Sequence, residues 1–546
     1  HAEDGIRVRD VTGVQTCALP IYARVVVLNR LRSPLKNAFL VTEKMFDRFF
    51  GPQWNPARQL GTVAFFFFWI AAGTGIFIYI FFETSVNGAY QSVEYITHEQ
   101  WYLAGVMRSL HRYASDGMVL AMVLHLLREW AFDRYRGVRW YAWFTGVPVI
   151  WLLYASGLSG YWLVWDELAQ YVALASMEWF DVLGIFGEPV ATNFLAAGSL
   201  TDRFFTLLVF IHIFVPLFLM FAMWIHVIRV SQPKINPPRG VAIGLSVMLL
   251  GLSLIKPAIS HGPANLGMIS QELHLDWFFM LFYPAFDAWG GVALWVLAIG
   301  GSVLLAVLPW LPPVKCPKPP VVTLDHCNGC GRCYADCPYG AITMMPRTDG
   351  LPYAQEAQVN AANCTRCGIC VGSCPTASPF RSAEALVTGI DLPHLDIKRM
   401  RAMVDDALAQ ANVKTPGGIV MVGCEHGPKV QELSMEGAAA VRLPCVSMLP
   451  PSFIDYMISN GAGGVMIAGC PECGCRFRYG VEWMQDRLDG RRDPYLRKRV
   501  PREQVRTFWA STMEAAELKE AEANFQSDLR DLRETADQVK GEGNDV

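Results

Sequence analysis

The sequence predicts a multidomain protein in which an all-α transmembrane bundle of six helices precedes a small α+β domain and then a small α/β domain. Three observations predict this order. Apolar stretches of spanning length crowd the first 312 residues, two cysteine runs follow, and beyond Pro416 short apolar runs alternate with helical ones. The chain has 546 residues, enough for three or four domains, and its 52% hydrophobic content is high for a soluble protein.

The first 21 residues are set apart from the rest of the chain. The stretch from Glu3 to Ile21, which includes Cys17, resembles a translated sequencing adapter and lacks the apolar core of a signal peptide. We therefore expect residues 1–21 to contribute no fold or function. Residues 22–59 are rich in Arg and Lys, and we expect them to form an N-terminal segment before the bundle.

Six apolar stretches within residues 60–312 are expected to form the transmembrane domain. A helix needs about 20 apolar residues to cross a bilayer, and only the fifth stretch is marginal in length. The six stretches are Leu60–Phe82, Leu103–Leu127, Tyr141–Trp165, Phe204–Ile228, Gly240–Ile255 and Gly290–Trp310.

The charges of the connecting loops predict the orientation of the bundle. Lys and Arg occur before the first stretch and in the second-to-third and fourth-to-fifth loops, whereas residues 83–102, 166–202 and 257–289 contain neither. Positively charged loops stay in the cytoplasm. We therefore expect a multi-pass protein of a bacterial or archaeal cytoplasmic membrane, with both termini and the cysteine-rich domains in the cytoplasm.

Four histidines form two pairs with the same spacing. His111 precedes His125, and His212 precedes His226, by fourteen residues in two different apolar stretches. Fourteen residues is close to four helical turns, so the members of a pair face the same way, about 21 Å apart. Both helices run inward, so His111 and His212 lie level near the periplasmic face, and His125 and His226 near the cytoplasmic face. Four histidines at matched spacing favour two bis-histidine sites over separate core histidines.

Four glycines repeat the same spacing in the first and third stretches. Gly61 with Gly75, and Gly146 with Gly160, are also fourteen residues apart and lie at the same two depths. Glycine lets something flat and wide approach the helix backbone. Ordinary small-residue helix packing explains any one glycine, but two glycine pairs in register with two histidine pairs favour a haem at each depth.

Residues from about 55 to 312 carry further motifs, namely Arg108–His111, His125–Arg128, Ser159–Trp165 and Arg203–Phe205. With them the sequence resembles the cytochrome b of quinol-oxidising bc-type complexes. The resemblance implies that His111 and His212 ligate a periplasmic-side b haem and that His125 and His226 ligate a cytoplasmic-side one. It also implies that Arg108 and Arg128, near these ligands, contact haem propionates.

The loop between the fifth and sixth stretches contains Leu275–Phe278, where that family has a Pro-Glu-Trp-Tyr motif at its outer quinol-oxidation site. The resemblance implies that Asp276 belongs to a quinone site. Its carboxylate is a plausible general base if partial burial raises its pKa. An exposed loop carboxylate that caps a short helix is an equally weighted alternative.

Two cysteine runs of identical spacing follow a proline-rich connector at residues 312–320. They are Cys327, Cys330, Cys333 and Cys337, and Cys364, Cys367, Cys370 and Cys374, each ending before a proline. The pattern resembles that of bacterial two-cluster ferredoxins, which implies an α+β ferredoxin-like domain over residues 313–385. In that family each fourth cysteine ligates the cluster of the other run.

The resemblance therefore implies two 4Fe-4S ligand sets, Cys327, Cys330, Cys333 with Cys374, and Cys364, Cys367, Cys370 with Cys337. Zinc or disulfides are disfavoured, because the spacing is not that of a zinc ribbon and the expected compartment is reducing. Cys316 fits neither run.

Residues 386–415 are expected to form a linker helix and residues 416–512 an α/β domain. Gly418–Cys424, Val441–Cys445 and Gly464–Cys470 are typical of strands, and Pro451–Asn460 of a helix between the last two. Cysteines at the carboxyl ends of neighbouring parallel strands meet at one edge of the sheet, where such folds place their sites.

With the Gly469–Cys475 pattern and Val505–Ser511, this segment resembles the delta subunit of methyl-viologen-reducing hydrogenase. That family carries electrons to the flavoprotein subunit of heterodisulfide reductase through a 2Fe-2S cluster. The resemblance implies the ligands Cys424, Cys445, Cys470 and Cys475, with Cys473 as an alternative to Cys475. For any single cysteine, a structural role without metal is the alternative. Residues 513–546 are strongly charged, and we expect a solvated helix that frays.

These features together predict the membrane subunit of an oxidoreductase. We expect it to exchange electrons between the quinone pool and a soluble flavoprotein resembling that of heterodisulfide reductase, using two b haems, two 4Fe-4S clusters and one 2Fe-2S cluster. The chain contains no glycine loop for a nucleotide or flavin, so chemistry away from quinone belongs to another subunit. A homodimer is one assembly we consider, and no nucleic-acid partner is expected.

Two alternative functions stay open. The chain could be a membrane-anchored electron conduit whose partner handles quinone, which predicts that loss of Asp276 leaves quinone turnover unaltered. A redox sensor or scaffold is the second alternative, and it predicts no sustained quinone turnover with any electron donor.

Overall fold

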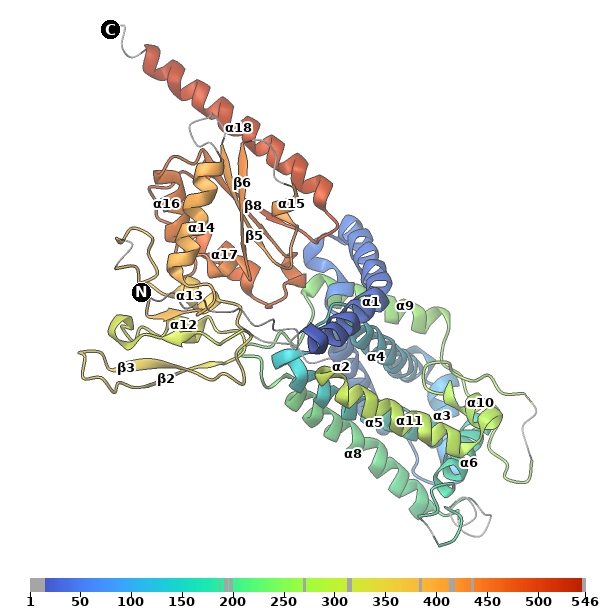
Figure 1. Ribbon diagram of the computed structural model, residues 1–546. Helices are drawn as coiled ribbons and strands as arrows, with labels where there is room; N and C mark the ends of the chain where they lie inside the picture. Colours follow the sequence, from blue (N-terminus) through green and yellow to red (C-terminus); the bar gives the residue numbers. More distant parts are fainter. Residues whose placement is uncertain are drawn as a thin grey trace, which may run out of the picture. The chain divides into compact units, whose positions relative to one another are not determined.

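The structure is a computed structural model and describes residues 15–185, 187–190, 195, 200–268, 272–311, 317–382, 385–411, 418–433 and 437–542 (Figure 1). Cys316 and residues 1–14 of the expected adapter-derived stretch lie outside the described residues. The chain divides into two compact units. Unit 1 comprises residues 1–42, 59–226 and 234–314, and unit 2 comprises residues 43–58, 227–233 and 315–546.

Each of the six predicted apolar stretches contributes a helix to the bundle. The helices are α2 (Leu60–Tyr79), α4 (Val106–Ala131), α5 (Trp140–Val164), α8 (Asp202–Val227), α9 (Arg239–Ile255) and α11 (Gly291–Val307). Within the described chain, four segments are long and apolar enough to cross a membrane, namely Leu60–Tyr79, Gly137–Val164, Asp202–Val227 and Gly291–Trp310. Because α9 is short and α4 carries several charges, the count of six spanning helices stays a prediction.

Shorter helices complete unit 1. They are α3 (Gly88–His98), α6 (Glu167–Asp181) and α10 (Phe282–Trp289), with a π-helical turn at Trp101–Gly105 before α4. Asp166 caps α6 by accepting a hydrogen bond from the Ala169 amide, and its second carboxylate oxygen accepts one from the His261 amide. This carboxylate therefore fixes the loop after α9 against the start of α6.

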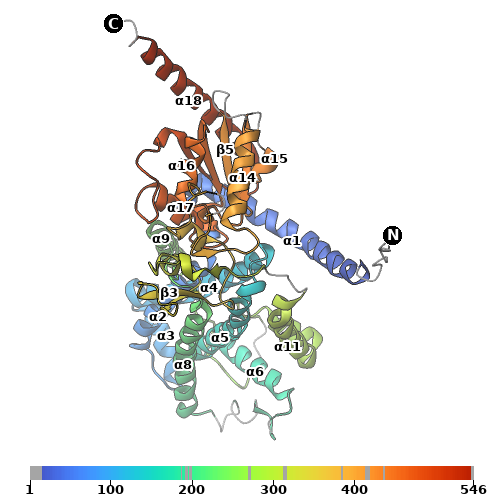
Figure 2. The ribbon, with the colours of Figure 1, turned by 60° about the vertical axis from the view of Figure 1, so that its left-hand side comes forward.

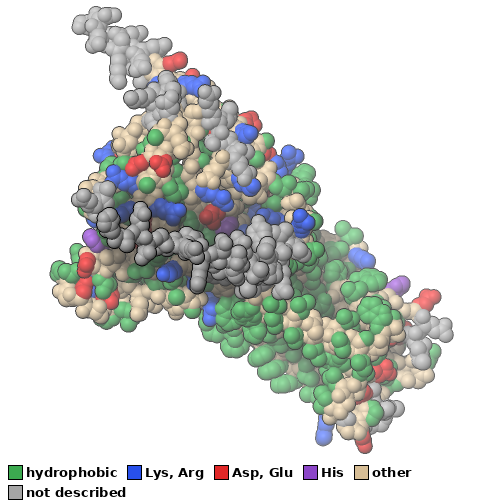
Figure 3. All heavy atoms as spheres, viewed as in Figure 1, with side chains coloured by type: hydrophobic (Ala, Val, Ile, Leu, Met, Phe, Trp, Pro, Cys, Tyr) green, Lys and Arg blue, Asp and Glu red, His purple; other side chains and the backbone are tan. Residues whose placement is uncertain are grey.

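The surface of the bundle is apolar. Figure 3 shows hydrophobic side chains gathered over the helices of unit 1. On α8 the exposed residues include Phe210, Phe214, Phe218 and Trp224, and α11 also exposes large aliphatic side chains. An apolar surface of this extent suits a lipid environment.

The part of unit 2 that carries the two cysteine runs has two small antiparallel sheets. β1 (Val321–Val322) pairs with β4 (Ile390–Asp391), and β2 (Ile342–Pro346) pairs with β3 (Gln355–Val359). A short helix begins inside each run, α12 (Arg332–Ala335) after Gly331 and α13 (Ile369–Ser373) after Gly368. Both glycines have a positive φ, which other residues rarely adopt, so each helix starts directly beside its cysteines.

The α/β part of unit 2 is a four-stranded parallel sheet in the order β6-β5-β7-β8. Its strands are β5 (Ile419–Cys424), β6 (Ala438–Leu443), β7 (Gly464–Gly469) and β8 (Val505–Trp509). The predicted parallel strands and the helix α16 (Pro451–Ser459) are confirmed. The predicted strand Val441–Cys445 is misplaced, because β6 starts earlier and stops before Pro444, which has no amide hydrogen to donate. β8 is an additional strand.

Helices cover both faces of this sheet (Figures 1 and 2). Residues that alternate along the strands, such as Val420 and Val422 on β5, pack in a core with α14 (Ile397–Gln410), α16 and α17 (Gly480–Leu488). Ile419 and Met421 on the opposite face pack with α18 (Ala515–Glu542). This alternation is the period-two pattern of a buried strand.

The prediction of a solvated C-terminal helix is wrong for the first half of α18. Leu518, Phe525 and Leu529 are buried against the sheet. They recur at intervals of seven and four residues, so they lie on one helical face despite the high charge of the segment.

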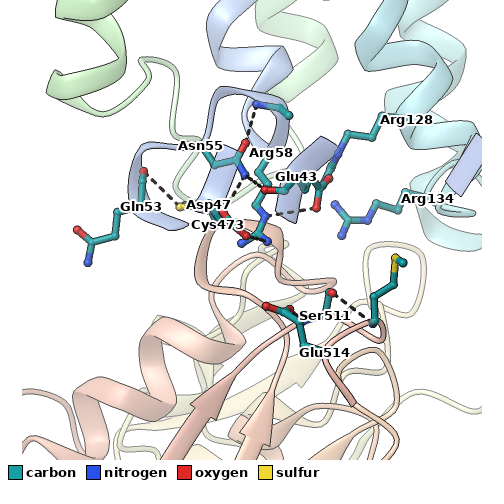
Figure 4. A network of polar contacts seen from close by, with 12 residues as sticks. Glu43, Asp47, Gln53, Asn55, Arg58, Arg128, Arg134, Cys473, Ser511 and Glu514 are labelled. Atoms are coloured by element: carbon teal, nitrogen blue, oxygen red, sulfur yellow. Dashed lines mark hydrogen bonds and ion pairs between the residues drawn. The ribbon is translucent and has the colours of Figure 1, made fainter. Parts of the chain in front are cut away.

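Residues 43–58 belong to unit 2, although they precede the first apolar helix (Figure 4). They comprise the end of α1 (Gln15–Phe50) and two short turns. The buried Arg58 guanidinium donates to Glu43 Oε2 at 3.3 Å and pairs with Asp47, and Asn55 donates to the Glu43 carbonyl at 2.8 Å. Lys44 pairs with Glu517 on α18. This segment is therefore an ordered part of unit 2.

Candidate functional site

Two of the four histidines, His111 and His212, face each other inside unit 1. The rings of His111 on α4 and His212 on α8 have their centroids 6.2 Å apart. A metal–imidazole nitrogen bond is about 2 Å long, so this gap can accommodate one metal atom between the two rings. These two histidines would therefore fit as the residues that hold one iron, which their spacing predicts. Both His125 and His226 lie about four turns farther along the same helices.

Hydrogen bonds orient both rings. His111 Nδ1 lies 2.8 Å from the Ala71 carbonyl oxygen of α2, and His212 Nδ1 lies 3.1 Å from the Ser156 carbonyl oxygen of α5. A carbonyl oxygen can only accept, so Nδ1 of each ring donates. The Nε2 lone pair then stays available to a metal, which is the arrangement of metal-ligating histidines in general.

Each of the four predicted glycines lies against one of the four histidines. A methyl group built on Gly75 would lie 2.9 Å from His111 Cε1, and one on Gly160 would lie 2.9 Å from His212 Cε1. The corresponding distances are 3.3 Å for Gly61 to His125 and 3.2 Å for Gly146 to His226. Each glycine thus lies beside the histidine that the spacing placed at the same depth. At each glycine the protein atoms nearest to the added methyl group belong to an imidazole ring of a neighbouring helix.

Hydroxyl side chains beside these glycines contact the rings, and the sequence reasoning missed them. Thr74, Ser159 and Thr145 immediately precede three of the glycines, and each hydroxyl oxygen lies within 3.2 to 3.4 Å of a histidine Nδ1. Leu60 holds the fourth position and has no hydroxyl. The recurrent Ser/Thr-Gly dipeptide was a signal in the sequence.

The two predicted propionate arginines have partners within unit 1. Arg108 donates to the Thr97 hydroxyl and, at 2.8 Å, to the Ser260 hydroxyl. The guanidinium of the buried Arg128 lies 4.8 Å from the centre of the Phe132 ring. Their contact with haem propionates stays a prediction.

The side chain of Asp276 lies in a polar network. Its side chain is 6% exposed, and its Oδ2 accepts hydrogen bonds from Arg112 at 3.1 Å and from the Tyr161 hydroxyl. Arg112 also pairs with Asp116 at 3.0 Å. Oδ1 accepts a bond from the Phe278 amide, so the carboxylate does cap the following turn. The alternative of an exposed carboxylate is therefore wrong, although its capping role is right.

The first predicted 4Fe-4S set lines a single pocket. Cys327, Cys330, Cys333 and Cys374 surround it, together with apolar side chains and backbone of the two small sheets. Cys374 joins three cysteines of the other run, which is the exchange that the resemblance implies. Burial raises the pKa of Cys333 to about 12, and the neighbouring thiols of Cys374, Cys330 and Cys327 add to the rise. Bound iron would instead lower the pKa of Cys333, because a cation stabilises thiolates.

The second set is also brought together. Cys364, Cys367 and Cys370 are buried, and Cys337 Sγ accepts a hydrogen bond from the Ala341 amide. Burial raises the pKa of Cys367 to about 12, and Cys337 and Cys364 both lie close enough to contribute. The sulfurs therefore share one site.

The third set lies at the carboxyl edge of the parallel sheet. Cys424 ends β5, Cys470 follows β7, and their sulfurs are 3.3 Å apart. A hydrogen bond with the Cys470 thiol and burial raise the pKa of Cys475 well above its usual range. The Cys475 sulfur also accepts hydrogen bonds from the backbone of Val481 and Phe477, which lower this pKa by less. Cys445 shares this environment, since burial and then the Cys475 thiol raise its pKa.

Cys473 points elsewhere. Its Sγ donates to the Gln53 carbonyl oxygen at 3.8 Å (Figure 4). The structure therefore groups Cys475, and not Cys473, with the three strand-end cysteines.

Among the residues that the structure describes, no three His, Cys, Asp or Glu side chains are set to hold a metal ion directly. A single tetrahedral metal ion has metal–sulfur bonds about 2.3 Å long. A cluster of several irons holds its cysteine ligands farther apart than such an ion does.

Three family models match successive parts of the chain. Residues 46–233 match cytochrome b/b6/petB, residues 326–378 match a 4Fe-4S dicluster domain, and residues 429–533 match the delta subunit of methyl-viologen-reducing hydrogenase. Among characterised proteins, the cytochrome b of Rhodospirillum rubrum is 25% identical over 294 residues, which is 47% of this chain and 69% of that protein.

A chain of a hyperthermophilic respiratory Complex III is a similar solved structure, with 20% identity and a TM-score of 0.39 over 47% of this chain and 76% of that one. These matches and the apolar helices show a membrane-integral electron-transfer protein. In it a cytochrome b-like haem segment is joined to a 4Fe-4S dicluster domain and a hydrogenase delta-subunit-like domain, in which the cysteines are grouped.

Proposed function

We propose that the chain is the membrane subunit of an oxidoreductase that exchanges electrons between the quinone pool and a soluble flavoprotein. Two b haems, two 4Fe-4S clusters and one 2Fe-2S cluster would carry the electrons. The proposal keeps the predicted domains 60–312 in the membrane and 313–385 and 416–512 in the cytoplasm. The predicted linker helix at 386–415 is wrong, because β4 pairs with β1 of the cysteine-rich part and α14 packs on the parallel sheet. The flavoprotein would resemble that of heterodisulfide reductase, as the delta-subunit likeness suggests.

One observation carries this proposal, namely the facing pair His111 and His212 with both Nδ1 atoms bonded to carbonyls of neighbouring helices. These residues would hold one haem through Nε2, and His125 with His226 would hold the other. A bound haem supplies one-electron redox chemistry. The protein's part is to fix the rings, and Gly75 and Gly160 leave room for them because a methyl group at either position would crowd a histidine ring.

The network around Asp276 is our candidate for the outer quinone site. Oδ2 of Asp276 would accept the proton of a quinol hydroxyl, in place of the bond that it accepts from Tyr161. Arg112 would hold the carboxylate in position. The geometry suits a general base, which must lie within hydrogen-bond reach of the proton that it takes.

An Asp276→Asn variant tests this site, with Asp287→Asn as a matched control because Asp287 is an exposed carboxylate on the nearby α10. We expect the rate with a soluble quinone analogue to fall in the first variant only. An unaltered rate in Asp276→Asn would contradict the outer site and favour the conduit function. A wild-type protein with no sustained turnover would favour the sensor function.

For the direction of flow we favour transfer from the clusters to quinone. In the orientation that the loop charges predict, outer-face quinol oxidation would drive electrons inward against the membrane potential. This costs about 2.3 kcal/mol per charge per 100 mV if the full potential is crossed. Potentiometric titration of the purified protein tests the direction, since clusters with potentials above those of the haems would contradict it.

A further inference from the structure

One small apolar cluster joins the second cysteine run to the third cysteine set. Cys367 and Ile369 of the second run pack with Cys445, Tyr479 and Trp483 of the α/β part, and all five side chains are buried. Gly480 lies between these side chains. A methyl group built on it would lie 2.3 Å from Cys445 Sγ, 3.4 Å from Cys475 Sγ and 3.9 Å from Ile369 Cδ1. We call these residues, Cys367, Ile369, Cys445, Tyr479, Gly480 and Trp483, the junction.

The backbone packs closely beside the junction. A methyl group on Gly372 of α13 would lie 2.0 Å from the Ser447 carbonyl oxygen, and one on Gly368 would lie 2.5 Å from Met448 Sδ. Ser447 and Met448 belong to the turn that follows Cys445. The helix of the second cysteine run therefore packs directly on the segment that carries Cys445.

A single buried arginine bonds to segments on both sides of the junction. Arg487 of α17 is 0% exposed and pairs with Asp336, donates to Ser373 Oγ at 2.7 Å and donates to the Ser447 carbonyl at 2.8 Å. Asp336 and Ser373 immediately precede Cys337 and Cys374, and Ser447 lies two residues after Cys445. Because guanidinium has several donors in a rigid fork, one side chain can hold all three segments.

Arg487 also bonds to Ser373, which precedes Cys374 of the first cysteine set, but the apolar cluster of the junction contains no cysteine of that set. The pocket of Cys327, Cys330, Cys333 and Cys374 is lined by residues 327–331, 333, 344, 357, 374–375 and 389–390. None of these described lining residues comes from the α/β part. The first set is therefore the more remote of the two from Cys445.

We infer that the junction is the route by which electrons pass between the second 4Fe-4S site and the 2Fe-2S site, with Arg487 as its positioning residue. This inference rests on the cofactors of the proposed function. With both groups bound, Cys364, Cys367, Cys370 and Cys337 would hold one and Cys424, Cys445, Cys470 and Cys475 the other. Transfer of one electron between them would oxidise one group and reduce the other, with no bond formed or broken. The soluble electron path then has a fixed order, in which the second 4Fe-4S site lies between the first one and the 2Fe-2S site.

Electron paramagnetic resonance of the fully reduced, full-length protein tests this order. A nearby reduced 4Fe-4S cluster speeds the spin relaxation of a 2Fe-2S cluster. We compare Cys364→Ala, which removes a ligand of the second site, with Cys327→Ala, the matched change in the first run. We expect loss of the fast relaxation in Cys364→Ala and its retention in Cys327→Ala, and the opposite pattern would overturn the inference.

A milder pair of variants keeps the test valid if a cysteine variant loses both 4Fe-4S clusters. Arg487→Lys cannot reach all three acceptors, whereas Arg491→Lys changes an exposed arginine four residues along. We expect Arg487→Lys to weaken the relaxation effect while the 4Fe-4S content stays at the wild-type level, and Arg491→Lys to leave the effect unaltered. Equal effects in both variants would overturn the role of Arg487. A wild type without a 2Fe-2S signal would instead overturn the cofactor content of the proposed function.

Discussion

Replacing Gly75 with alanine should disturb the outer histidine pair without disturbing the helix that carries the change. Alanine favours helix formation over glycine by about 1 kcal/mol, so α2 itself gains stability. The new methyl group, however, would lie 2.9 Å from His111 Cε1 and 3.2 Å from His111 Nδ1. Ordinary contacts begin at 3.4 Å, so the ring must retreat by 3.4 − 2.9 = 0.5 Å or more, or α2 must move away from α4.

Either movement weakens the bond between His111 Nδ1 and the Ala71 carbonyl, which is 2.8 Å long. The ring cannot simply back away, because the ring of His212 has its centroid 6.2 Å from that of His111 and the proposed function has the two rings hold one iron. Loss of such an orienting partner typically lowers metal affinity by about 10- to 100-fold. We therefore expect a lower haem-to-protein ratio and a shifted midpoint potential for one of the two haems.

Gly73→Ala is a matched control on the same helix, because a methyl group there meets nothing within 4 Å. Both variants gain the same helix propensity, and only one crowds a histidine. The haem content of the purified proteins is measured from the pyridine haemochrome spectrum and the potentials by redox titration. If Gly75→Ala matches Gly73→Ala in both measurements, the assignment of this glycine to the histidine ring is refuted.

Two further pairs of variants test unit 2. Cys475→Ser should abolish the 2Fe-2S signal in electron paramagnetic resonance, whereas Cys473→Ser should keep it, because only Cys475 lies among the strand-end sulfurs. The reverse result would assign the ligand role to Cys473. Phe525→Ala should destabilise unit 2 by about 3 to 5 kcal/mol, since this side chain is 0% exposed against the sheet. Leu532→Ala, at a position 46% exposed on the same helix, should change stability by about 0.5 kcal/mol or less. The two variants are compared by thermal unfolding followed through the iron–sulfur absorbance. Equal losses of stability in both would contradict the packing of α18.

Much of the site follows from local periodicity. The fourteen-residue spacing puts two histidines on one face of a helix whatever surrounds it, because the helix repeat is fixed. His111 and His212 indeed face each other, and the four glycines lie at the four histidines as their depths predicted. The parallel strands β5 and β7 likewise end at Cys424 and next to Cys470, as the apolar runs indicated.

Features that depend on contacts between residues far apart in the sequence could be found only from the tertiary structure. Two cysteines only two residues apart, Cys473 and Cys475, point in different directions, and spacing could not choose between them. The charged α18 has too few apolar residues to reveal a buried face by composition. Arg487 resembles a surface arginine in the sequence, since its acceptors lie far along the chain.

The sequence by itself thus determined which elements form and which side chains each one presents, because the helical and strand repeats are local properties of the backbone. Only the tertiary structure decided which of those side chains meet. It assigned residues 43–58 to unit 2, placed Asp276 beside Arg112 and Tyr161, and joined Cys367 to Cys445. The physical reason is that burial and close packing are satisfied jointly by segments far apart in the chain.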